Sequence, residues 1–133
     1  MAKPSNSTSN LTLPKLLNTV DTFFKFNKFS DAKSLIIAYI SKDSQNTLHQ
    51  HLLHPPSTHP QPSKALLDTS IGAYTQLGNP HCALHLFNKM KRRKLRPNLL
   101  TCNTLLNSFV KIKSFLSIPT CRGIFDDMGK MGI

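Results

Sequence analysis

The apolar residues of this chain recur three or four positions apart, which is the spacing of one face of an α-helix. The clearest stripe is Ala83, Phe87 and Met90, whose positions i, i+4 and i+7 would face a common core. Similar stripes run through most of the chain, and we expect helix pairs over residues 13–43, 63–98 and 99–133. The pattern therefore predicts an all-α protein.

Capping residues indicate where these helices begin. Ser63 is expected to cap the first helix of the second pair, because its hydroxyl can accept from a free backbone N–H. Asn79 and Pro80 then suit the N-cap and the first helical position of its partner. Asn98 is expected to cap the third pair, and Ser30 to cap a helix within the first pair. These assignments predict short turns between paired helices.

The chain also resembles itself at a spacing of 35 residues. The positions that match at this spacing are Thr69 and Thr104, Ile71 and Leu106, and Tyr74 and Phe109. Further along, Phe87 returns as Phe125 and Met90 as Met128 at a spacing of 38, so the second copy carries three extra residues near 113–119. A helical period of this size predicts an α-solenoid of antiparallel helix pairs. The four aromatic residues Tyr74, Phe87, Phe109 and Phe125 are expected in its core.

The remaining segments differ in composition. Residues 1–12 are rich in Ser, Thr and Asn and contain no acid, which fits either a disordered terminus or an organellar import leader. Four prolines within 55–62 exclude a helix interior there. The expected division is a leader or tail at 1–12, a degenerate helical repeat at 13–43, a Pro- and His-rich linker at 44–62, one repeat at 63–98 and a truncated one at 99–133. Within the linker, residues 48–53 could form a short helix.

The charge of the chain points to a polyanionic partner. Its net charge is +11, all six acids are Asp, and none lies between Asp68 and Asp126. Such a field favours nucleic acid or an anionic surface. Lys91, Arg92 and Arg93 could contact phosphates, or they could simply match the negative end of a helix dipole. No apolar run is long enough to insert into a membrane.

The sequence contains no arrangement of catalytic residues. A group of four histidines lies at His49, His51, His54 and His59, but in a Pro-rich segment without a nearby Cys or acid it is a weak candidate for zinc. The chain has no Glu, which excludes the His-Glu-x-x-His motif of metalloproteases. Its three cysteines are expected to be small core residues. We therefore expect no catalysis, metal, cofactor or small-molecule substrate.

Residues 63–133 resemble the pentatricopeptide repeats of plant proteins. The matching residues are Ala73, Tyr74, Gly78, Ala83, Leu84, Leu86, Phe87, Met90, Lys91, Pro97, Asn98, Thr101, Asn103, Thr104, Leu105, Leu106, Phe125, Met128, Gly132 and Ile133. Residues 13–47 look like a degenerate copy. The resemblance implies a solenoid in which the first helix of each pair lines a concave face.

The same resemblance implies that the chain binds single-stranded RNA, one base per repeat. The base-reading positions of the family fall on Asp68 and Asn98 in the first clear unit and on Asn103 in the second. Apolar residues that flank the base fall on Ala65 and Leu100. An acid at 68 is unusual in this family, and it is unfavourable beside RNA unless it accepts from a base amino group.

A basic residue that faces phosphate in this family falls on Lys111. The sequence departs from the family pattern at Ser70, where an apolar residue is usual, and at Lys94, where glycine is usual. It also ends at Ile133, in the middle of a repeat, and a solenoid that stops there lacks a polar cap. This end suggests a fragment, a truncated gene product or a decayed copy.

The resemblance favours a non-catalytic RNA-binding protein that acts in RNA processing, stability or translation in the mitochondrion or chloroplast. Two alternatives remain open. The same groove could bind a peptide, which would make the chain a protein-interaction solenoid, or the chain could be a truncated product without an activity of its own. The dependence of binding on salt separates RNA from peptide, because RNA phosphates release counterions when they are bound.

Overall fold

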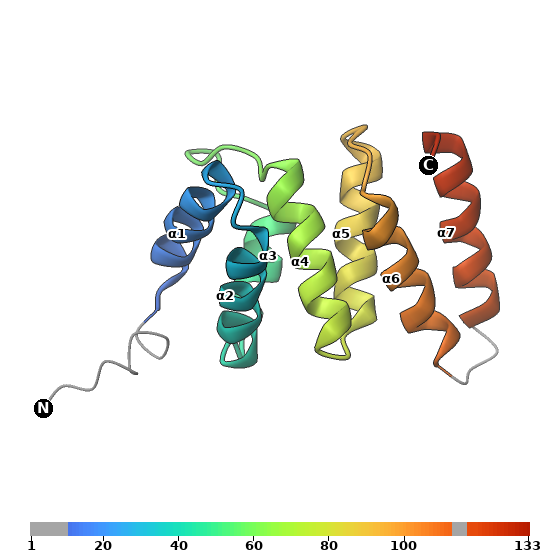
Figure 1. The fold of residues 1–133 in the computed structure, drawn as a ribbon, viewed down its shortest axis with the longest axis horizontal. Helices are drawn as coiled ribbons and strands as arrows, with labels where there is room; N and C mark the ends of the chain where they lie inside the picture. The colour runs from blue at the N-terminus through green and yellow to red at the C-terminus, as the bar shows by residue number, and fades with distance from the viewer. Residues whose placement is uncertain (1–10, 113–116) are drawn as a thin grey trace, which may run out of the picture.

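The computed structural model describes residues 11–112 and 117–133, and these residues form seven α-helices and no strand (Figure 1). The helices are α1 (Leu13–Lys25), α2 (Phe29–Ser41), α3 (Thr47–Leu53), α4 (Lys64–Gln76), α5 (Pro80–Arg92), α6 (Leu99–Val110) and α7 (Ser117–Met131). The prediction of an all-α fold is confirmed. The three-residue insertion lies partly at 113–116, outside the described residues.

The helices follow one another along the long axis of the molecule (Figure 1). Helix α4 packs against α5, and α6 packs against α7, as the two predicted pairs require. Helix α4 also lies between α2 and α6, so that α2, α4 and α6 form one row. Behind this row, α5 packs against α3 and α6. The result is the expected solenoid of stacked helix pairs.

The helix starts follow the capping residues in the second pair. The Ser63 hydroxyl accepts a hydrogen bond from the Leu66 backbone N–H at 3.1 Å, and Pro80 opens α5 after Asn79. The turn before α5 contains Gly78 with a φ of 78°, a conformation that a side chain would strain. Helix α2 begins at Phe29, so the expected cap Ser30 instead lies inside its first turn.

The predicted apolar stripes form the core, with one exception. Tyr74, Phe87 and Met90 are fully buried, and Phe109 is 2% exposed. Phe125 was expected beside them, but 66% of it is exposed. The difference arises because α5 packs against three helices, whereas α7 packs mainly against α6 within the described residues. One side of α7 therefore lacks the neighbours that cover Phe87.

Part of the segment expected to be a linker belongs to the core. Residues 47–53 form α3, whose Leu48 and Leu52 are fully buried. The Asp43 carboxylate caps this helix, because it accepts from the backbone N–H groups of Thr47 and Leu48, each at 2.9 Å. At the other end, Lys89 of α5 donates to the Leu52 carbonyl at 2.7 Å. Both ends of this short helix are thus paired with side chains.

Candidate functional site

A groove runs along the row formed by α2, α4 and α6. It consists of two hollows, of about 410 Å³ and about 730 Å³. Lys33 of α2, Gly72 of α4 and Thr104 of α6 line both hollows, which makes the groove continuous. A surface built from three successive elements of a solenoid is suited to an extended ligand. We refer to these two joined hollows as the groove.

The smaller hollow brings together three residues that the sequence analysis selected. Asp68 of α4, Asn98 at the start of α6 and Leu100 of α6 all line it. Lys111, directly after α6, lines the larger hollow. Asn103, which is exposed, lines neither hollow. The groove therefore collects the two base-reading candidates of the first clear unit, together with Leu100 and the basic residue of the second unit.

Asp68, Asn98 and Lys64 form a closed hydrogen-bond network at the rim of the groove. The Lys64 Nζ donates to Asp68 Oδ2 at 2.8 Å and to Asn98 Oδ1 at 2.9 Å. The Asn98 backbone N–H donates to Asp68 Oδ1 at 3.0 Å. The two positions that the resemblance assigned to one base thus lie together, and a lysine joins their side chains.

Local structure explains why this network forms. Lys64 stands four residues before Asp68 on α4, which places both side chains on one face of the helix. Asn98 is the N-cap residue of α6, but its side chain accepts no hydrogen bond from the backbone of that helix. Its backbone N–H lies at a helix start, where donors need a partner outside the helix. Asp68 supplies that partner, so the carboxylate also fixes where α6 begins relative to α4.

Burial and the Asp68 carboxylate make the neighbouring thiol unreactive. Cys102 of α6 is fully buried. Burial, followed by the negative charge of Asp68, raises the pKa of the Cys102 thiol to about 11. Because the thiolate is the reactive form of cysteine, this residue has the character of a small core side chain, as expected from the sequence.

Lys33 places a positive charge in the middle of the groove. A Cβ atom built on Gly72 would lie 3.5 Å from both Cε and Nζ of Lys33, so the lysine crosses α4 where that helix has no side chain. The three ion pairs found among the described residues do not include Lys33. Its ammonium group is therefore available to an anionic ligand.

Much of the basic cluster at the end of α5 pairs within the protein. Lys91 forms an ion pair with Asp127 of α7 at 2.8 Å, and Arg93 donates to the Pro62 carbonyl. Lys89 is 6% exposed and holds the end of α3, and burial followed by the charges of Arg93 and Arg92 lowers its pKa. Arg92 is exposed. The cluster thus ties α5 to its neighbours and lines neither hollow of the groove.

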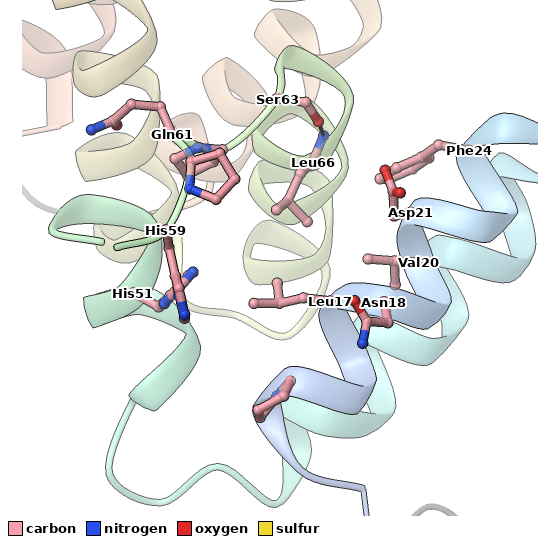
Figure 2. A pocket seen from close by; sticks show the side chains of 13 residues that line it. Leu17, Asn18, Val20, Asp21, Phe24, His51, His59, Gln61, Ser63 and Leu66 are labelled. Carbon is pink, nitrogen blue, oxygen red and sulfur yellow. Dashed lines mark hydrogen bonds between the residues drawn. The ribbon is translucent and has the colours of Figure 1, made fainter. Parts of the chain in front are cut away.

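A separate cleft of about 480 Å³ lies between α1, α3 and the start of α4. In Figure 2, Leu17 of α1 and Leu66 of α4 project into it, and His51 and His59 stand together at its other wall, with ring centres 5.4 Å apart. Asp21 pairs with Lys25 at 3.5 Å, not with an imidazole. Among the described residues, no three His, Cys, Asp or Glu side chains are grouped to hold a metal ion.

Comparison with known proteins identifies the repeats. The model of the PPR repeat family matches residues 65–111. A curated protein of Arabidopsis thaliana, pentatricopeptide repeat-containing protein At2g16880, is 49% identical over 121 residues, which cover 89% of this chain. The chain belongs to the pentatricopeptide repeat family. No solved structure matches it significantly.

Members of the pentatricopeptide repeat family are generally RNA-binding proteins of organellar RNA processing. This pentatricopeptide repeat chain spans 16% of the length of its Arabidopsis relative. The matched residues include α5, α6 and all of α4 except its first residue, Lys64. These helices form most of the groove. None of the described helices combines the length and apolarity needed to cross a bilayer.

Two lysines of this pentatricopeptide repeat site were not selected from the sequence. Lys64 had a visible signal, because it stands four residues before Asp68 on a predicted helix. Lys33 had none, since it enters the groove only through the packing of α2 on α4. Ala65 is half-buried and, like Asn103, lies outside the lining of the groove. The site is thus more basic than the family positions alone indicate.

Proposed function

We propose that this chain binds single-stranded RNA along the groove, without catalysis, and serves organellar RNA processing, stability or translation. The observation that carries the proposal is the charge of the groove. Lys33 and Lys111 line it, and Asp68 is the single acid among its lining residues. Lys64 pairs with that acid. An extended basic groove on a helical repeat suits a phosphate backbone.

In this proposal, the phosphates lie near Lys33 and Lys111 and the bases lie near α4 and α6. Leu100 is 77% exposed beside Asp68 and Asn98, and an exposed apolar side chain at this place offers a surface against which a base can stack. Ala65 and Asn103 are proposed to contact the flanking and following bases, at the positions that the family resemblance assigns. Arg92 remains a proposed outer contact for phosphate.

Titration of a fluorescent single-stranded RNA at several salt concentrations tests the proposal. Affinity should fall steeply with salt, because bound phosphates release counterions. Lys33→Gln and Lys111→Gln should each reduce the magnitude of the negative slope of log K against log salt concentration by about 1. Lys42→Gln is the matched control, since Lys42 is exposed at the end of α2 and lies outside the groove.

Two results would contradict RNA binding in the groove. One is an affinity for RNA that does not change with salt. The other is an equal effect of Lys33→Gln and Lys42→Gln, which would show a general charge effect. A peptide-binding solenoid would instead bind RNA weakly and keep its affinity for a protein partner at high salt. A fluorescent fusion imaged in plant cells tests the proposed location in the mitochondrion or chloroplast.

A further inference from the structure

Helix α2 is in phase with the two clear repeats. Helices α2, α4 and α6 begin 35 residues apart, at Phe29, Lys64 and Leu99. The fourth residue of each helix is fully buried, and these residues are Ala32, Leu67 and Cys102. Residues 29–63 therefore occupy the place of one more unit before residues 64–98.

The second half of this unit also corresponds to the next one. Leu52 of α3 stands 35 residues before Phe87 of α5, and both are fully buried. Pro62 stands 35 residues before Pro97, and both prolines are buried. Helix α3 is shorter than α5, with seven residues against 13, but it packs against α5 as the second helix of a unit should. Helix α2 is thus the first helix of this unit.

Two side chains of α2 share the face that lines the groove. Phe29 and Lys33 both line the smaller hollow, and they stand four residues apart, which is the spacing of one helix face. Phe29 is 49% exposed, and its ring contacts Phe24 of α1, with ring centres 5.7 Å apart. This contact holds the ring in place, while its exposed part remains open to a ligand. Lys33 brings a positive charge one turn further along the same helix.

We propose that Phe29 and Lys33 form a further nucleotide-binding position at the α2 end of the groove, where Phe29 stacks on a base and Lys33 contacts a neighbouring phosphate. This inference rests on the proposed RNA-binding function. Aromatic rings next to basic side chains bind single-stranded nucleic acid in this way. Because every base has a π-face, the position accepts any base and adds affinity without adding sequence choice.

The other two units lack this combination of side chains. The corresponding residues of the next unit are Lys64 and Asp68, which pair with each other at 2.8 Å. In the last unit they are Leu99 and Asn103. Among the described residues, only α2 therefore joins an aromatic ring at this place to a lysine outside the ion pairs. The stacking position follows from residues particular to this unit, not from the repeat pattern.

A tryptophan reporter tests the stacking directly, because the chain contains no tryptophan of its own. In Phe29→Trp, a stacked base should quench the fluorescence when single-stranded RNA is added. Phe26→Trp is the matched control, since Phe26 is 69% exposed between α1 and α2 and lies outside the groove. Its fluorescence should stay constant. Equal quenching in both variants, or none in Phe29→Trp, would contradict stacking at this position.

Affinities for oligouridine, oligocytidine and oligoadenosine of equal length test the lack of sequence choice. Phe29→Ala should weaken binding to all three by about fivefold or more, the loss expected for one stacked base. Phe29→Leu keeps an apolar side chain against Phe24, so it should preserve the fold and still weaken binding to all three. Phe26→Ala should leave the affinities unchanged. Circular dichroism establishes that each variant is folded.

The outcomes separate this inference from the proposed function. Unchanged affinity in both Phe29→Ala and Phe29→Leu, or a loss that the three oligonucleotides do not share, would overturn the stacking position and leave RNA binding along the groove intact. Failure of the original chain to bind any of the three at low salt would overturn both proposals.

Discussion

The backbone N–H of Asn98 donates to the Asp68 carboxylate at 3.0 Å and so joins two helices across 30 residues of sequence. One carboxylate thereby fixes the start of α6, and its second oxygen pairs with Lys64. A position that the family resemblance assigns to base recognition therefore also supports the packing of α6 on α4 in this chain. Any substitution at Asp68 is consequently expected to affect folding as well as binding.

We expect Asp68→Ala to destabilise the protein by about 1.5–3 kcal/mol, the range for hydrogen bonds to charged groups. The variant leaves the Asn98 N–H without its acceptor and leaves the Lys64 ammonium with the Asn98 side-chain oxygen alone. Asp68→Asn should cost less, because its amide oxygen can still accept from the Asn98 N–H. Urea unfolding followed by circular dichroism measures both variants. A stability of Asp68→Ala equal to that of the original chain would contradict the structural role.

Ser70→Ala is expected to stabilise the protein by about 1 kcal/mol. Ser70 is fully buried, and its hydroxyl has no hydrogen-bond partner among the described residues, so its removal relieves a desolvation cost. Ser108→Ala is the matched control, because the Ser108 hydroxyl donates to the Leu105 carbonyl at 2.6 Å. Denaturant midpoints should rise for the first variant only. A loss of stability in Ser70→Ala would reveal a partner for this hydroxyl.

Lys94→Gly should raise the free energy of unfolding by about 1 kcal/mol, since Lys94 has a φ of 60° and left-handed backbone is unfavourable for residues with a side chain. The family pattern places glycine at this position. Asn27 has a φ of 59°, but asparagine tolerates this conformation better. Asn27→Gly should therefore change stability less. Thermal unfolding of both variants checks the order, and an equal gain would argue against backbone strain at Lys94.

Acidification is expected to destabilise the contact between α3 and α5. His49 lies 3.3 Å from His85, measured between Nε2 and Nδ1, and its ring meets Tyr74 edge-on. Burial, then the charges of His85 and His54, lowers the pKa of His49 below 6.5. Below that pH the unfolded chain binds more protons than the folded one, so the free energy of unfolding falls as the pH decreases.

Urea unfolding at pH values above and below 6.5 measures this effect, with 6.5 the ordinary pKa of histidine. His49→Phe should make stability less dependent on pH, because it removes the imidazole and keeps an aromatic ring against Tyr74. Some dependence should remain, since burial and His59 lower the pKa of His51 as well. An unchanged pH profile in His49→Phe would contradict the role of His49.

The sequence predicted the elements whose signals are local. Ser63 and Pro80 marked the starts of α4 and α5, because capping depends on residues within one helical turn. Features that depend on tertiary packing were missed. A short helix at 48–53 was expected, but its burial in the core was not, because seven residues are too few for a clear periodic stripe. Phe125 shares its residue type, but not its neighbours, with Phe87. Local patterns do not contain that information.

The residues of the candidate site also fall into those that the sequence selected and those that only tertiary packing brings to the site. The resemblance selected Asp68, Asn98 and Leu100, which the groove does bring together. It could not show that Asp68 is covered by Lys64, because the ammonium is held by Asn98 from another helix as well as by its own helical partner. The place of Lys33 in the groove could not be predicted for a related reason, since Lys33 approaches Gly72 only when α2 packs against α4.

The pairing of Lys89 with α3 has a consequence for the order of folding. A helix of seven residues is too short to be stable alone, and its last carbonyls find their donor in α5, 36 and 37 residues away. Helix α3 is therefore expected to become stable only after α5 has formed. Helices α4 and α5, in contrast, are neighbours in sequence and can pack against each other early. Assembly of the array is expected to start in the repeats and spread toward α3.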